Sequence, residues 1–391
     1  MGRLNKQLDP AQTGFEADKL EADLRKRIVG QDEAIQQIVN TYQTFLAGMA
    51  GSGRPVGSFL FLGPTGSGKT RMAEAVAESL VGDMRAVIKI DCAEFQHSHE
   101  IAKLIGAPPG YLGHRETHPV LSQDALNQYQ TEAFKLSFVL FDEIEKASDA
   151  LWNLLLGILD KATLTLGDNR RVDFSRAIIF MTSNLGAAEM GAILRPNFGF
   201  ASSEVQRRRR EEAVDEGLAG KVNRAGLDAA RRKFAPEFIN RIDKTVVFRT
   251  LGAPELRGIL TIELKIVQER IFRTMAGAPF VFTVTESAQD HLLQQGSDVK
   301  YGARHLKRAI DHSMVHPLSN LIATGQVRGG DLIRVDYDEA CRLLMFFKDA
   351  ENVPLATMAQ MADISTATPD SPLLAKAVEH PRAAAVRSSR R

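Results

Sequence analysis

The chain contains, at residues 63–70, the segment Gly63-Pro64-Thr65-Gly66-Ser67-Gly68-Lys69-Thr70. It follows the apolar run Phe59-Leu60-Phe61-Leu62 and precedes the helix-like stretch Arg71–Val81. This is the pattern G-x-x-x-x-G-K-[ST] in a strand–loop–helix setting, where backbone N–H groups and a helix N-terminus surround phosphate. Lys69 would neutralise the β- and γ-phosphates, and the Thr70 hydroxyl would complete the shell of a Mg²⁺ ion. The alternative is an ordinary glycine-rich turn, which the complete motif and its setting disfavour.

Two other apolar runs end in polar residues. Phe138–Phe141 leads into Asp142-Glu143, and Ala177–Met181 leads into Thr182-Ser183-Asn184. Parallel α/β sheets bind ligands at the carboxyl ends of their strands. We therefore expect Asp142 to hold Mg²⁺ through water, Glu143 to polarise the attacking water, and Asn184 to reach the γ-phosphate and that water. In isolation, an acidic pair often only caps the next helix, and a segment like the one at Asn184 is usually a plain turn.

Five short apolar runs alternate with helix-like stretches in the first part of the chain. This pattern predicts an α/β fold, with a parallel sheet covered on both faces by helices. The turn Gly167-Asp168-Asn169 predicts a hairpin over Leu164–Phe174. The runs are Ser58–Leu62, Ala86–Ile90, Ser137–Phe141, Ala177–Met181 and Thr245–Phe248.

The pattern changes after Phe248. A long helix-like stretch, then single strands and further helices predict a second, smaller α+β domain, with strands at 280–284, 332–337 and 343–347. We predict four regions: a leader helix or linker at 1–25, a large domain at 26–249, a small domain at 250–348, and an Ala/Ser/Pro-rich tail at 349–391 that is largely disordered.

Composition excludes several classes of protein. Forty-nine basic and 48 acidic residues among 391 give a formal net charge of +1, so nucleic acid is an unlikely partner for the chain as a whole, although the basic end of the tail leaves a contact open. No apolar run reaches the length of a membrane span or forms a signal peptide. Cys92 and Cys341 match no metal-ligand spacing and fit a reducing compartment, so we expect a cytoplasmic protein.

The order of phosphate loop, Asp-Glu strand end and strand-ending Asn resembles AAA+ ATPases. The sequence around these motifs resembles the second ATPase module of the Clp family of protein unfoldases, which includes ClpA, ClpB and ClpC. The N-terminal domain and first ATPase ring of those chains do not fit in residues 1–25. The matching stretches are Arg27–Ala34, Ile105–Gly113, Phe141–Ala147, Phe234–Asp243 and Tyr301–Arg308.

The resemblance implies a five-stranded large domain with a small lid domain, and it assigns further roles at the ATP site. Ile28 and Val29 would pack on the adenine. Arg241 would be the arginine finger that reaches the γ-phosphate bound by a neighbouring subunit, for which a planar, permanently charged guanidinium is suited. Arg304 would be sensor 2, which touches the nucleotide and couples it to domain rotation. For any single arginine the alternative is a surface ion pair.

The resemblance also implies contacts with polypeptides. Tyr111 and Leu112, between Gly110 and Gly113, resemble the pore loop that grips an unfolded chain, although a lone tyrosine is more often a surface or core residue. The tripeptide Phe198-Gly199-Phe200 nearly matches a loop that docks on a peptidase ring, but a packed turn is the favoured interpretation.

The resemblance therefore predicts an ATP-hydrolysing, Mg²⁺-dependent unfoldase or remodelling chaperone that forms a ring, expected to be a hexamer, and threads polypeptide through its pore. Two alternatives stay open: a regulatory ATPase of a Clp-type compartmental protease, and a nucleotide-switched assembly or adaptor ATPase that does not thread. Asp142, Glu143 and Arg241 argue against a switch that never hydrolyses ATP, and Tyr111 argues against a non-threading protein.

Overall fold

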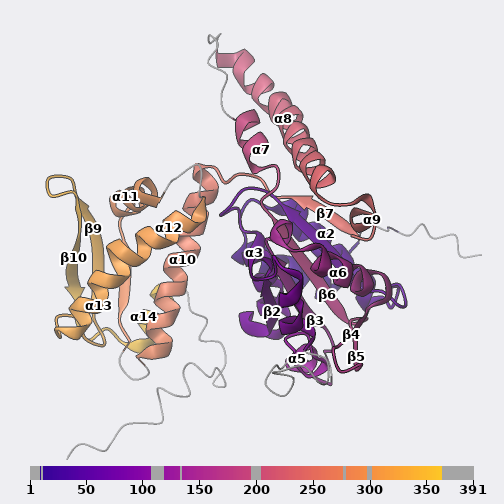
Figure 1. Ribbon diagram of the computed structural model, residues 1–391. Helices are drawn as coiled ribbons and strands as arrows, with labels where there is room; N and C mark the ends of the chain where they lie inside the picture. Colours follow the sequence, from indigo (N-terminus) through magenta and orange to yellow (C-terminus); the bar gives the residue numbers. More distant parts are fainter. Residues whose placement is uncertain are drawn as a thin grey trace, which may run out of the picture. The chain divides into compact units, whose positions relative to one another are not determined.

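The computed structural model describes residues 9, 12–106, 119–132, 134–194, 204–275, 279–296 and 302–362, with backbone only at 194, 204–216 and 219. The chain divides into two compact units, Met1–Thr250 and Leu251–Arg391 (Figure 1). Each unit is considered by itself. None of the helices in the described part of the chain has an apolar stretch of the length that spans a membrane.

The first unit is built on a five-stranded sheet with the strand order β2-β3-β6-β1-β7. All four pairings are parallel, which confirms the α/β prediction. Every residue of β1 and β6 is buried, as expected for central strands covered on both faces. The strands are β1 (Gly57–Leu62), β2 (Val87–Asp91), β3 (Ser137–Asp142), β6 (Ala177–Ser183) and β7 (Lys244–Val247).

Alternate side chains of these strands enter two hydrophobic cores, one on each face of the sheet. Phe59, Phe61 and Phe180 pack with apolar residues of α1 (Phe15–Arg27), α2 (Asp32–Leu46) and α3 (Lys69–Val81). Leu60 and Met181 face the opposite core, shared with α6 (Asp149–Lys161). Within the first core, the rings of Phe59 and Phe180 lie 5.6 Å apart, between paired strands. The alternation thus fixes which face each helix covers.

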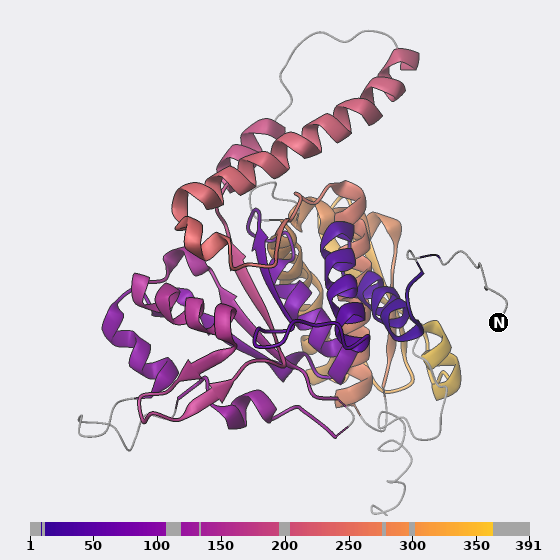
Figure 2. The same ribbon diagram turned by 90° about the vertical axis from the view of Figure 1, so that its right-hand side faces the viewer.

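Shorter elements surround the sheet. The predicted hairpin is present as β4 (Thr163–Thr165) and β5 (Arg171–Asp173), which pair in antiparallel fashion. A 30-residue helix, α8 (Glu204–Lys233), packs against α7 (Ala187–Leu194) (Figure 2). The remaining α-helices described in this unit are α4 (Ala102–Ile105), α5 (Gln123–Asn127) and α9 (Pro236–Ile239).

The second unit is the predicted α+β fold. Its sheet has the order β10-β9-β8, in which β9 is antiparallel to β10 and parallel to β8. The helices pack around buried residues such as Leu260, Phe280 and Leu306. The elements are α10 (Ala253–Thr274), β8 (Val281–Val284), α11 (Glu286–Gly296), α12 (Ala303–Ile310), α13 (His316–Ala323), β9 (Leu332–Asp338), β10 (Leu343–Ala350) and α14 (Leu355–Met361).

The prediction of a disordered tail from residue 349 is wrong for residues 349–362. Strand β10 continues to Ala350, and α14 follows it. Met358, Ala359 and Ala362 are spaced as one face of a helix and pack against Phe272 and Val281. This alanine-rich stretch therefore forms a short amphipathic helix, although its composition resembles that of a disordered tail. The rest of the predicted tail, 363–391, lies outside the described residues.

Candidate functional site

The predicted phosphate loop runs from Gly63 to Gly68, between β1 and the first residue of α3, Lys69. Gly63, Gly66 and Gly68 have φ angles of +144°, +76° and +99°, which residues with a side chain rarely adopt. A Cβ atom at Gly63 would lie 2.6 Å from the carbonyl oxygen of Phe248. Glycine is thus required at position 63, both for the backbone conformation and because Phe248, after the neighbouring strand β7, approaches closely.

Lys69 is buried inside this loop, with 7% of its surface exposed. Its Nζ donates hydrogen bonds to the carbonyl oxygens of Gly63 at 2.7 Å and Pro64 at 2.8 Å, and to Asn184 Oδ1 at 2.9 Å. Burial of a charged amine is costly unless such acceptors surround it. The loop therefore surrounds the Lys69 ammonium group with oxygen acceptors at the carboxyl end of the sheet.

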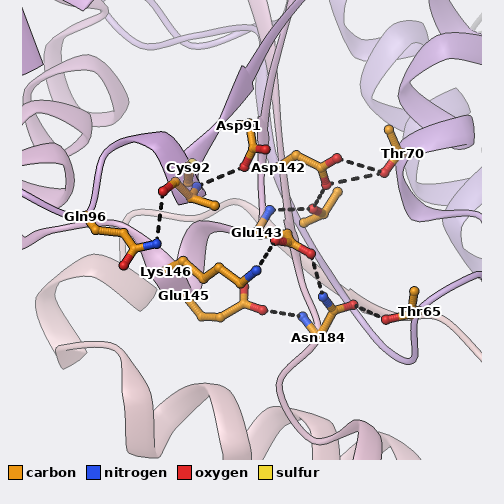
Figure 3. A network of polar contacts seen from close by, with 12 residues as sticks. Thr65, Thr70, Asp91, Cys92, Gln96, Asp142, Glu143, Glu145, Lys146 and Asn184 are labelled. Atoms are coloured by element: carbon orange, nitrogen blue, oxygen red, sulfur yellow. Dashed lines mark hydrogen bonds and ion pairs between the residues drawn. The ribbon is translucent and has the colours of Figure 1, made fainter. Parts of the chain in front are cut away.

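Asn184, the first residue after β6, connects the loop to the acidic strand end. Its Oδ1 accepts hydrogen bonds from Lys69 and, at 3.3 Å, from Thr65 Oγ1. Its Nδ2 donates to Glu143 Oε1 at 3.3 Å. One amide side chain thus bridges the phosphate-loop lysine and the predicted base, as Figure 3 shows for its contacts with Thr65 and Glu143.

Thr70, in the first turn of α3, faces Asp142, the last residue of β3. Thr70 Oγ1 lies 3.3 and 3.2 Å from the two carboxylate oxygens of Asp142, and the Thr182 hydroxyl also donates to Asp142. Hydroxyl and carboxylate oxygens are the hard donors that Mg²⁺ prefers. The two residues predicted to serve the metal ion are therefore adjacent, and their chemistry fits it.

Glu143 has a left-handed backbone conformation, with φ at +56°. Its N–H donates to Thr182 Oγ1 at 3.0 Å, so the turn after β3 is tied to β6. Its Oε2 forms a 2.5 Å ion pair with Lys146, and this contact raises the pKa of the lysine. The carboxylate of Glu143 faces Asn184. Its backbone has a sparsely populated conformation, and such conformations cluster at functional sites.

Buried Cys92, at the end of β2, lies beside this network (Figure 3). Burial raises the pKa of its thiol, and the nearby carboxylate of Asp142 adds to the effect. Cys92 packs in the hydrophobic core of this face of the sheet, and its environment favours the thiol over the reactive thiolate.

Other predicted site residues lie elsewhere. Ile28 is buried in the core shared with α1, and Val29 is half-buried beside it. Arg241 forms ion pairs with Glu237 at 2.9 Å and Asp160 at 3.4 Å. Arg304 belongs to the second unit, where it is exposed in the first turn of α12. The predicted pore residues Tyr111 and Leu112, and the tripeptide 198–200, lie outside the described residues.

The structure adds Gln31, a residue that sequence analysis left without a role. Gln31, with 5% of its surface exposed, donates hydrogen bonds from Nε2 to the carbonyl oxygens of Ser67 at 3.1 Å and Arg249 at 3.0 Å. Its Oε1 accepts from the Arg249 N–H at 3.2 Å. One side chain thus ties the phosphate loop to the segment after β7. Thr182, Glu145 and Lys146 were also missed as members of the network around Glu143.

Comparison with known families and proteins agrees with this geometry. Residues 54–245 match the AAA domain (Cdc48 subfamily), and residues 251–335 match the C-terminal, D2-small domain of ClpB protein. The chain is 39% identical over 316 residues to the chaperone protein ClpB of Bdellovibrio bacteriovorus, covering 81% of this chain and 33% of that protein.

A second relative and a solved structure point the same way. The ATP-dependent Clp protease ATP-binding subunit ClpC of Staphylococcus saprophyticus is 37% identical over 319 residues, which are 82% of this chain and 36% of that protein. A closed-state cryo-EM reconstruction of Hsp104 with ATPγS and FITC casein matches with a TM-score of 0.67 and 31% identity, over 85% of this chain and 52% of that one. The chain spans about a third of the length of its curated relatives.

Replacing Gln31 by leucine should destabilise the first unit. The Ser67 carbonyl and both backbone groups of Arg249 would lose their buried partner, which costs about 1–3 kcal/mol for each group left unsatisfied. Urea unfolding should show a lower free energy of unfolding for Gln31→Leu. The matched control is Gln36→Leu, because Gln36 bonds only the exposed Asn40 side chain among its hydrogen bonds described here. Equal losses in the two variants would contradict the bridging role.

Proposed function

Because this chain belongs to the Clp family of AAA+ ATPases, with a ClpB-type D2-small domain after its AAA domain, we propose that it hydrolyses ATP to unfold or remodel polypeptides. The observation that carries the proposal is the Asn184 side chain, which joins Lys69 of the phosphate loop to Glu143. A motor needs this connection between the phosphates and the group that activates water. For this chain, the activity, substrates and partners of its longer relatives are part of the proposal.

Each side chain has one task in the proposed hydrolysis. Lys69 stabilises negative charge on the β- and γ-phosphates. The Asn184 amide orients the attacking water, and the Glu143 carboxylate accepts a proton from that water as its oxygen bonds to the γ-phosphorus. The bond to the β-phosphate oxygen breaks, which leaves ADP and inorganic phosphate.

Nucleotide and Mg²⁺ use follows from the family, and the chain offers a matching donor set. Thr70 and Asp142 would hold the metal ion, which when bound supplies positive charge against the phosphate oxygens. The remaining loop residues, Gly63 to Gly68, would enclose the phosphates. Ile28 and Val29 would contact the adenine, and Arg304 would contact the nucleotide as sensor 2.

Arg241 is proposed as the arginine finger acting in trans. Its side chain is 26% exposed and is held by acidic residues of its own chain. The active site is then complete only when a neighbouring subunit supplies this residue, so the proposal includes a ring, expected to be a hexamer.

Polypeptide is the proposed substrate, gripped by Tyr111 and Leu112. The names of the relatives support this class of substrate: two are a chaperone and a protease-associated ATP-binding subunit, and the Hsp104 reconstruction includes casein. The ClpC likeness keeps the protease alternative open, with docking through Phe198-Gly199-Phe200 as its prediction. A cytoplasmic location also stays a prediction.

The variant Glu143→Gln should bind ATP and lose turnover, because the amide keeps the shape of the carboxylate but takes up no proton from water. Lys69→Ala should instead lose nucleotide affinity. Steady-state phosphate release and the binding of a fluorescent ATP analogue separate the two effects. Near-normal hydrolysis by Glu143→Gln would remove Glu143 from its role.

Arg241→Ala should fold and bind ATP but hydrolyse it poorly, since arginine fingers contribute about 10³–10⁵ in rate. Mixing Arg241→Ala with Glu143→Gln subunits should restore some ATPase activity, because some interfaces then combine an intact base with an intact finger. Co-purification through two different tags verifies that mixed rings form. Mixed rings no more active than either parent would count against a shared site.

Tyr111→Ala should keep basal ATPase within a few-fold of wild type and lose unfolding of a tagged fluorescent substrate. Tyr111→Phe should be mild, because the grip uses the flat apolar face of the ring. A buried core tyrosine would behave differently, since its truncation to alanine would cost about 3–5 kcal/mol. Lower thermal stability with joint loss of ATPase and unfolding would therefore rule out the pore role.

A further inference from the structure

We propose that Glu145 is a positioning residue that holds Asn184 in place for hydrolysis. Glu145 lies in the short turn Ile144–Lys146, directly after the proposed base. Its Oε1 accepts a hydrogen bond from the backbone N–H of Asn184 at 3.0 Å (Figure 3). The inference rests on the proposed function, because it concerns how Asn184 is held for that reaction.

The Asn184 backbone needs such a partner because of where it lies. The register of β6 with β1 ends at Ser183, so Asn184 is the first residue beyond the ladder. A backbone N–H that leaves a sheet must find another acceptor. The Glu145 carboxylate provides this acceptor. The side chain of Asn184, whose backbone is held in this way, contacts Lys69, Thr65 and Glu143.

The turn that carries Glu145 is itself fixed. Ile144 is fully buried, and its carbonyl oxygen accepts a hydrogen bond from Trp152 Nε1 at 3.1 Å. The N–H of Glu143, at the start of the turn, donates to Thr182 on β6. Glu145 therefore projects from a rigid support, which is the requirement for positioning another side chain accurately.

Stability alone does not explain a carboxylate at this position. Glu145 Oε2 is buried and has no hydrogen-bond partner among the described residues. Its neighbour Glu143 is a second carboxylate, and both carboxylates converge on Asn184, one on the side-chain amide and one on the backbone N–H. An unsatisfied buried oxygen costs free energy, and so does the like charge of Glu143, although Lys146 offsets part of that charge. Such costs are typical of residues retained for function.

The test is a double-mutant cycle on steady-state ATPase. Glu145→Ala should lower kcat roughly 10- to 100-fold, the scale of small misplacements in an active site, and should leave KM for ATP nearly unchanged. Asn184→Ala should lower kcat at least as much. If Glu145 acts through Asn184, the double variant should be no slower than Asn184→Ala, because the two losses share one cause.

Three further variants make the cycle decisive. Glu145→Gln keeps an acceptor oxygen and should retain most of the kcat, whereas Glu145→Asp retracts the oxygen and should not. Glu94→Ala removes an exposed carboxylate from the turn after β2 and should leave kcat unchanged. Melting temperatures identify any variant that fails to fold, in which case Glu145→Asp replaces Glu145→Ala in the cycle.

The outcomes separate this inference from the proposed function. A wild-type protein without ATPase activity would overturn the proposed function and this inference with it. An active wild type with normal kcat in Glu145→Ala, or with fully multiplicative losses in the double variant, would overturn only the positioning role. Loss of activity in Glu145→Gln equal to that in Glu145→Ala would also overturn it.

Discussion

Parallel pairing of β6 with β1 on one side and β3 on the other is the interaction on which the rest of the structure depends. In this register Leu62 lies opposite Ser183, and Phe141 lies opposite Met181. The phosphate loop, the acidic pair and Asn184 therefore leave the sheet side by side, although they come from three distant parts of the sequence. A shift of one residue in either pairing would turn alternate side chains to the wrong face and separate Lys69, Asp142 and Asn184.

The hydrophobic cores enforce this register. Phe59, Phe61 and Phe180 are fully buried on one face, while Leu60 and Met181 are fully buried on the other. Exchanging the two sets would place phenylalanines in space built for leucine and methionine, which close-packed interiors do not tolerate. The positions of the polar residues at the strand ends thus follow from packing several residues away.

Much of the fold could be predicted from the sequence because its signals are local. Apolar runs marked the strands, the glycine pattern marked the phosphate loop, and the strand-end residues Asp142, Glu143 and Asn184 were expected at one edge. The bridge from Gln31 to Arg249 could not be foreseen, since it joins residues 218 positions apart through an uncharged amide that has no periodic signature. Glu145 was hidden for a related reason: it looks like one more charge on a turn. Helix α14 is hard to predict because its alanine-rich composition is typical of a disordered tail, and only the spacing of Met358, Ala359 and Ala362 indicates a helix.

Arg241, the proposed arginine finger, is held in ion pairs by its own chain. Its partners Glu237 and Asp160 are 65% and 41% exposed, and ion pairs so open to water contribute only about 0–1 kcal/mol. A guanidinium can make two parallel, charge-assisted hydrogen bonds to a phosphate, and these are stronger than bonds between neutral groups. In the proposed exchange of the two carboxylates for a phosphate on a neighbouring subunit, the arginine would therefore give up little free energy. The weak pairs hold the arginine until then, and the proposal that it acts between subunits requires such a readily released contact.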